Sequence, residues 1–131
     1  MTIPASHIDL LERPVIWHVA TIGPSGEPQS SPVWAGLDDD GTVVISMLKR
    51  RQKVTNLKAN AAVALSACEH RGDRYRHVEL RGTASIEDDP DHTLIYAMAK
   101  KYLGVDDWDY VDPKDARVTI RITVIHANTM G

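Results

Sequence analysis

Five basic side chains fall within ten residues of this sequence, where an apolar segment ends and a helical pattern begins. Arginine and lysine there can pair with phosphate oxygens, Asn56 can add a neutral hydrogen bond, and the free amides of a helix's first turn point the same way. Cations at a helix start oppose its dipole by up to about 1 kcal/mol each, so the cluster is unfavourable unless an anion binds there. It predicts a compact anionic ligand, with a solvated run of charge as the alternative. The cluster consists of Lys49, Arg50, Arg51, Lys53 and Lys58.

Motifs of the common catalytic classes are absent from the sequence. There is no glycine-rich phosphate loop, no nucleophile elbow and no pair of neighbouring cysteines. The histidines lack the close spacing of metal ligands, so we expect no metal site and assign each histidine a structural or surface role. The single cysteine, Cys68, can form no internal disulfide and is expected to be a small buried thiol in a strand. A triad hydrolase and a zinc enzyme are therefore disfavoured, and no catalytic residue can be named.

Composition and charge narrow the classes of partner. The formal net charge is −3, whereas recognition of a nucleic-acid backbone needs a broad excess of lysine and arginine. No apolar run approaches the roughly 20 residues of a membrane span, and residues 1–4 have neither a basic nor an apolar signal region. The length of 131 residues suits one domain. We therefore expect a single cytoplasmic domain over residues 1–131 that binds a small molecule, no nucleic acid and no membrane.

Strand and turn patterns place the basic cluster between two sets of strands. Apolar and β-branched residues predict strands over 15–22, 29–37 and 42–48, joined by turns that contain glycine. Residues 51–59 have one apolar stripe, Val54 and Leu57, as is typical of a short helix. Further strands are predicted over 61–69, 75–86 and 117–126, with a helix that starts near Asp91 and ends at Gly104.

The order of these elements favours an antiparallel barrel. Strands joined by short turns, with helices inserted at two points, do not suit a doubly wound parallel sheet, which needs a helix after every strand. A short amphipathic turn around Ile8 and Leu11 precedes the first strand. We therefore predict a mainly β fold in which six antiparallel strands form a barrel with two or three short helices.

Several segments together resemble a known family. They are residues 17–29 (WHVATIGPSGEPQ), 31–34 (SPVW), 51–57 (RQKVTNL) and 78–84 (VELRGTA). In type and order they resemble the pyridoxamine 5'-phosphate oxidase-like superfamily of FMN-binding split barrels, and more narrowly its actinobacterial branch of F420-dependent reductases. The resemblance continues through residues 99–104 and 122–131 and covers nearly the whole chain. It implies a split β-barrel that forms a homodimer, with cofactor sites built from both protomers.

The resemblance also implies which residues contact the cofactor. Those beside its ring system would be Ser31, Pro32, Val33, Ser46, Met47 and Leu48. Those that hold its phosphate would be Arg51, Lys53 and Asn56, with Arg50 adding positive charge beside them. The second protomer would contribute Tyr75 and His77. Three aromatic residues would either line the substrate side of the ring or pack in the core, namely Trp34, Trp108 and Tyr110.

The family uses either FMN or the deazaflavin coenzyme F420, and both carry a phosphate. We expect F420 because its tail bears several carboxylates, for which Lys49, Arg50 and Lys58 would form a basic track. Each such exposed pair contributes only about 0.2–1 kcal/mol. The implied reaction is hydride transfer from the reduced ring to an unsaturated, carbonyl or quinone-type acceptor, with a proton from a side chain or solvent. An FMN-dependent oxidase or reductase and a non-catalytic flavin- or haem-binding protein are the alternatives.

Overall fold

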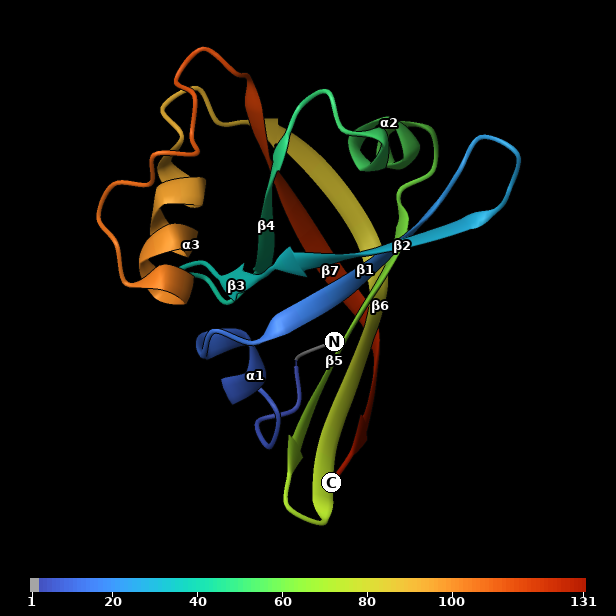
Figure 1. The fold of residues 1–131 in the computed structure, drawn as a ribbon. Coiled ribbons are helices and arrows are strands. Elements are labelled where there is room, and N and C mark those ends of the chain that lie inside the picture. Colours follow the sequence, from blue (N-terminus) through green and yellow to red (C-terminus); the bar gives the residue numbers. More distant parts are fainter. Residues whose placement is uncertain (1–2) are drawn as a thin grey trace.

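The computed structural model, which describes residues 3–131, is built around one sheet of seven strands (Figure 1). They lie in the order β2-β1-β5-β6-β7-β4-β3, and neighbouring strands are antiparallel. The strands are β1 (Ile16–Ile22), β2 (Pro28–Trp34), β3 (Gly36–Leu37), β4 (Val43–Leu48), β5 (Ala62–Arg71), β6 (Arg74–Asp88) and β7 (Arg117–Met130). Within the same residues the helices are α1 (Asp9–Glu12), α2 (Gln52–Ala59) and α3 (Thr93–Leu103).

The predicted mainly β, antiparallel split barrel is confirmed, but residues 3–131 form seven strands instead of the predicted six. The expected strand over 29–37 is interrupted at Ala35, which is fully buried. The Ala35 N–H donates to the Tyr102 hydroxyl at 3.1 Å, and its carbonyl accepts from Lys101 Nζ at 2.7 Å. Because these side chains supply the hydrogen bonds at the break, the chain can change partners there. β2 pairs with β1, whereas β3 pairs with β4.

Alternation along the strands builds the core. In β1, Trp17 and Val19 are buried while His18 between them is exposed. The indole N–H of Trp17 donates to the Leu10 carbonyl at 3.0 Å, which ties α1 to the sheet. Each buried valine, leucine or isoleucine contributes about 1.5–3 kcal/mol, so the apolar face of the sheet supplies most of the stability.

The thiol of Cys68 is exposed, contrary to the expectation that it is buried. Side chains of a strand point alternately to its two faces. In β5 the inward positions are taken by Val63, Leu65 and Ala67, which are buried. Cys68 follows Ala67 and therefore faces outward.

A bulge bends the two longest strands. The pairing of β6 with β7 shifts register between Arg81 and Gly82. A β-carbon at position 82 would lie 2.0 Å from the Thr123 carbonyl oxygen, so glycine is required for this close approach. The bend helps the sheet to curve around the core, and the β5–β6 hairpin and the end of β7 extend away from α2 and α3 (Figure 1).

The pairing of β4 with β7 brings distant segments together. Leu48 pairs with Arg117, and Ser46 with Thr119, so the start of β7 lies beside the end of β4. α2 begins shortly after β4 ends, and α3 lies on the other side of β4 (Figure 1). No helix in the described part of the chain has both the length and the apolar character that crossing a membrane requires.

Candidate functional site

A cavity of about 560 Å³ lies where β1, β2, β4 and β7 approach the two longer helices. Its cationic side chains come from the start of α2 and the start of β7, while α3 and the loop after it contribute apolar and aromatic side chains. The wall is therefore assembled from segments that are far apart in the sequence. The lining residues are Ile16, Pro32, Val33, Trp34, Ser46, Met47, Leu48, Arg51, Lys53, Ile95, Met98, Trp108 and Arg117.

Two cations of the basic cluster, Arg51 and Lys53, line this cavity. Neither forms an ion pair with a carboxylate of residues 3–131. Lys53 Nζ instead donates to Ser31 Oγ at 2.8 Å. Burial, and secondly the nearby charge of Arg51, lowers the pKa of Lys53. The two side chains therefore bring positive charge to the cavity that the described part of the protein does not neutralise.

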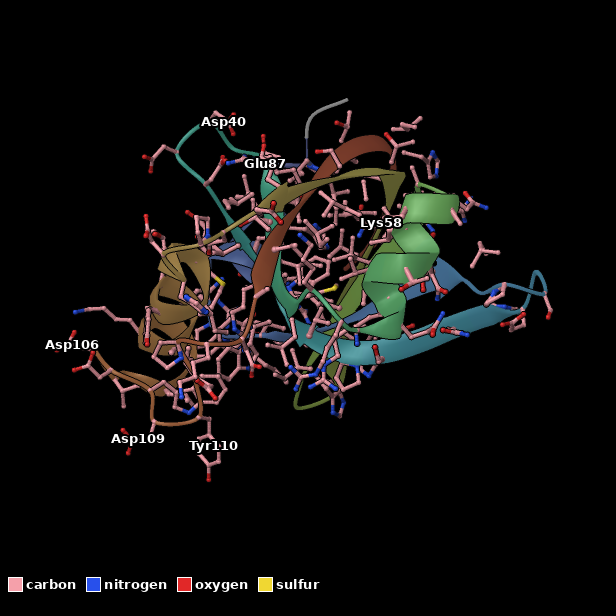
Figure 2. All side chains as sticks on the ribbon, turned by 90° about the horizontal axis from the view of Figure 1, so that it is seen from above. Asp40, Lys58, Glu87, Asp106, Asp109 and Tyr110 are labelled. Carbon is pink, nitrogen blue, oxygen red and sulfur yellow. The ribbon has the colours of Figure 1, made fainter. Side chains whose placement is uncertain are left out.

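Other cations of the cluster lie outside the cavity. Lys49 pairs with Asp88 at 2.9 Å, and Arg50 pairs with Asp115 at 3.0 Å. Lys58 is exposed near the end of α2 (Figure 2). The lining thus includes Arg51 and Lys53 but not Arg50, for which the sequence predicted a role in cofactor binding.

Arg117 is a lining residue that sequence reasoning missed. It is the first residue of β7, and from the sequence it resembles any charge at the start of a strand. Pairing of β7 with β4 brings Arg117 beside Ser46. The Arg117 Nη1 donates to Ser46 Oγ at 3.4 Å. Its Nε is buried and has no hydrogen-bond partner within residues 3–131, and burial lowers its pKa. No spacing in the sequence connects residues 51 and 117, because only the sheet brings them together.

Two tryptophans form the aromatic part of the wall. Trp34 stacks on Tyr102, with ring centres 5.0 Å apart and an angle of 12° between the planes. The ring of Trp108 lies 5.0 Å from that of Trp34. Neighbouring rings therefore hold both indoles in place while they remain part of the cavity surface.

Tyr110 does not share that position. Its side chain is 85% exposed and projects outward from the loop after α3 (Figure 2). Its ring centre lies 5.6 Å from that of Trp108, so it packs beside a lining residue without reaching the cavity. Of the three aromatic residues considered for the substrate side, the structure brings Trp34 and Trp108 to the cavity.

The cavity suits a ligand with an anionic part and a flat apolar part. Partly desolvated cations without a counter-charge are unfavourable, so an anion beside Lys53 and Arg117, with the exposed Arg51 next to them, would relieve an electrostatic cost. Indole rings and aliphatic side chains can pack against a planar ring system. A phosphorylated flavin or deazaflavin has both parts, and the residues present therefore fit such a cofactor.

Residues 3–131 match the family model described as pyridoxamine 5'-phosphate oxidase. The chain belongs to the pyridoxamine 5'-phosphate oxidase family. The family resemblance of the sequence motifs is thereby confirmed. No curated protein matches the chain at a significant level.

Three solved structures illustrate how similar this family member is to known proteins. A structure named F420 reductase is 31% identical, with 96% of this chain and 98% of that chain covered and a TM-score of 0.84. The conserved hypothetical protein Rv2991 from Mycobacterium tuberculosis is 24% identical, with 98% and 84% covered and a TM-score of 0.80. An FAD-binding protein from Mesorhizobium loti is 20% identical, with 98% and 95% covered and a TM-score of 0.68. The last two similarities show the shared fold alone, whereas the first agrees with the F420-reductase branch.

The cavity of this family member gathers most of the residues implied for the ring and the phosphate. Ser31 lies next to it through its hydrogen bond with Lys53. The predicted residues that line it are Pro32, Val33, Ser46, Met47, Leu48, Arg51 and Lys53.

Asn56, predicted to contact phosphate, forms hydrogen bonds within the protein. It is buried, and its Nδ2 donates to Thr21 Oγ1 at 3.0 Å and to Gln29 Oε1 at 2.8 Å. Its Oδ1 accepts from Gln52 Nε2 at 2.9 Å. Both donors of the amide are therefore engaged, and the side chain fastens α2 to β1 and β2.

Tyr75 and His77 lie near the start of β6 and do not line this cavity within the same chain. His77 pairs with Met130 of β7, and the Tyr75 hydroxyl lies 2.9 Å from the Met130 sulfur. The resemblance assigns both residues to the site of the other protomer, and that assignment stays a prediction.

Proposed function

We propose that this protein is an F420-dependent reductase that passes a hydride from the reduced deazaflavin to an unsaturated, carbonyl or quinone-type small molecule. The observation that carries the proposal is a single cavity that combines unneutralised cations, Arg51 and Lys53, with the indole rings of Trp34 and Trp108. The similarity to an F420 reductase over nearly the full length of both chains supports the choice of cofactor.

The residues have separable roles in this proposal. Arg51 and Lys53 would bind the phosphate, with Ser31 fixing the position of the lysine amino group. Residues 32–33 and 46–48 would border the ring, and the tryptophans would exclude water from the side where the acceptor packs. The chemistry that the deazaflavin supplies when bound is hydride transfer, with a proton completing reduction of the acceptor.

The proposal includes a homodimer in which each site takes residues from both chains. The outer side chains near the start of β6 and in β7 support it, because several are large, apolar and exposed. Tyr75 is 49% exposed, Met130 54% and Ile125 60%. A second protomer covering them would remove apolar surface from water and bring Tyr75 and His77 within reach of the partner's cavity.

The choice between F420 and FMN depends on more than the phosphate, since both cofactors carry one. The predicted basic track for the F420 tail is reduced, because Lys49 and Arg50 are paired with Asp88 and Asp115. Preference for F420 therefore relies on the overall similarity to the F420 reductase. FMN is the competing cofactor in the test.

Equilibrium titration of the purified, cofactor-stripped protein tests the proposal. Oxidised F420 and FMN are added in parallel while tryptophan emission is followed at two salt concentrations, because Trp34 and Trp108 line the cavity. We expect tighter binding of F420, weakened by salt. Reduced F420 is then mixed with quinones and conjugated enones, and reappearance of the oxidised absorbance reports turnover. Preference for FMN would replace the proposal with a flavin enzyme, and binding without turnover of any acceptor would indicate a carrier.

A further inference from the structure

The guanidinium group of Arg117 is poorly satisfied by the described protein. An arginine side chain has five N–H donors. Among residues 3–131 its one hydrogen bond is the long contact of 3.4 Å from Nη1 to Ser46 Oγ, and Nε is buried with no partner. The buried Nε is out of reach of a ligand, but the terminal nitrogens have no partner among residues 3–131 other than Ser46 Oγ and can donate to an anion in the cavity. Arg117 lines the cavity that contains Arg51 and Lys53.

The nearest acidic residues do not supply that partner. Asp115 uses its carboxylate to pair with Arg50 at 3.0 Å. The carboxylate of Asp89 accepts the backbone N–H groups of Thr93 and Leu94 at 3.2 and 3.0 Å, at the start of α3. Both carboxylates influence Arg117 from a distance without forming an ion pair with it. The positive charge of Arg117 therefore remains available on the cavity side.

Arg117 lines the same cavity as Arg51 and Lys53, the two cations at the start of α2. The positive charge of Arg51 affects both Lys53 and Arg117. Like charges held this close repel one another unless an anion lies among them. Arg117 belongs to β7, whereas Arg51 and Lys53 lie at the start of α2, so the three cations reach the cavity from different elements.

We propose that Arg117 is the third cation of an anion-binding subsite and binds the phosphate of the cofactor together with Arg51 and Lys53. Arg117 thereby gives the cavity a preference for phosphorylated ring compounds over the same rings without phosphate. The identity of the cofactor rests on the function proposed above, whereas the subsite requires only a phosphate attached to a ring.

Two matched ligand pairs test this assignment. One pair is FMN and riboflavin, and the other is F420 and its deazaflavin chromophore without the phosphate-containing tail. Dissociation constants are measured for the wild type, for Arg117→Met, which keeps an unbranched apolar stem but removes the guanidinium group, and for Arg117→Lys. Lys114→Met is the control, because Lys114 is exposed in the loop before β7 and does not line the cavity.

We expect Arg117→Met to weaken binding of the phosphorylated member of a pair by roughly 10- to 100-fold and to leave the other member unchanged. Arg117→Lys should fall between this variant and the wild type, since it keeps the charge without the planar fork. The unliganded Arg117→Met protein should have an unchanged or higher Tm, because a partly buried charge without an ion pair is removed.

Equal weakening of both members of a pair would place Arg117 against the ring and overturn the assignment. No weakening, or failure of the wild type to bind either phosphorylated ligand, would overturn it as well. If F420 does not bind but the FMN pair shows the expected difference, the proposed reductase function fails while the phosphate subsite stands.

Discussion

The amino group of Lys53 is positioned by a neutral partner, the hydroxyl of Ser31, at 2.8 Å. A hydroxyl fixes the lysine without cancelling its charge and leaves two N–H donors for a ligand. Lys53→Ala should weaken binding of the phosphate-bearing cofactor by roughly 10- to 100-fold. The Tm should change little, because burial already disfavours the charged amine, as its lowered pKa indicates. Fluorescence titration and thermal unfolding measure the two effects.

The corresponding loss for Arg51→Ala should be smaller, because this side chain is exposed and its charge is screened. Lys114→Ala serves as the matched loss of one surface charge. A Lys53→Ala protein that fails to fold, yet binds cofactor normally in its soluble fraction, would show that Lys53 has a structural role instead.

Trp108 and Tyr110 are a natural pair for testing the acceptor side of the cavity. They lie on the same loop and their rings are in contact, but Trp108 lines the cavity while Tyr110 faces solvent. Trp108→Ala should raise the KM for a planar acceptor about tenfold. Loss of the stacking of a planar ring on an aromatic side chain costs about 1–3 kcal/mol. The Kd of the cofactor should stay within about twofold of the wild type. Steady-state kinetics with Tyr110→Ala in parallel would reveal whether disturbance of the loop alone has the same effect.

At the scale of elements, the break between β2 and β3 depends on the Tyr102 side chain of α3. Its hydroxyl donates to the Val15 carbonyl at 2.5 Å and accepts the N–H of the buried Ala35 at 3.1 Å. Tyr102→Phe keeps the ring that stacks on Trp34 but leaves these backbone groups without their partner. We expect a loss of about 1–3 kcal/mol in the free energy of unfolding, measured by urea denaturation. Tyr110→Phe should change it by less than about 0.5 kcal/mol, and similar losses in both variants would contradict the assigned role.

The attachment of α1 to β6 should depend on pH. Asp9 accepts two hydrogen bonds from Arg76, at 2.7 and 2.9 Å, and two from Arg13, at 2.9 and 3.3 Å. The bonds from Arg76, followed by those from Arg13, hold the pKa of Asp9 well below its ordinary value of 3.8. Because the folded-state pKa is the lower one, this stabilisation is complete above pH 3.8 and is lost as the pH falls further.

Asp9→Asn should therefore lower the free energy of unfolding by about 1 kcal/mol at neutral pH, a modest loss because the pair is partly exposed. The difference from the wild type should shrink as the pH falls below 3.8. Urea unfolding across a pH series measures it, with Asp109→Asn on the outward-facing loop as the control (Figure 2). A difference that stays constant down to the lowest pH would show that the carboxylate charge is unimportant.

The elements were more predictable than the contacts between them. Local patterns gave the strands, the two longer helices and the basic start of α2, because alternation and helical spacing are properties of neighbouring residues. The break at Ala35 was not predictable, since its hydrogen bonds come from Lys101 and Tyr102 in a distant helix. Arg117 was missed for the same reason, as only the pairing of β4 with β7 brings it to the cavity. The hydrogen bonds of Asn56 were not predictable either, because the residues that accept them lie on β1 and β2.

At the scale of the whole molecule, sites shared between protomers would allow complementation. A Lys53→Ala chain and a His77→Ala chain each disable a different part of the proposed shared site. In a mixed dimer one site carries both defects and the other carries neither. Unfolding and refolding the two variants together should therefore restore tight cofactor binding to one site per mixed dimer. Titration of the mixture against each variant refolded alone measures this, and no recovery would mean that the residues do not meet across an interface.

The unneutralised cations of the cavity also bear on how long the protein survives in a cell. Arg51, Lys53 and Arg117 repel one another in the ligand-free chain, so an anion that binds them stabilises the folded state by mass action. Proteases degrade the unfolded fraction, which grows when that ligand is scarce. If the proposed phosphate subsite is correct, abundance of the protein would follow the supply of its cofactor without a separate regulatory element, because the charges that bind the ligand would also destabilise the empty protein.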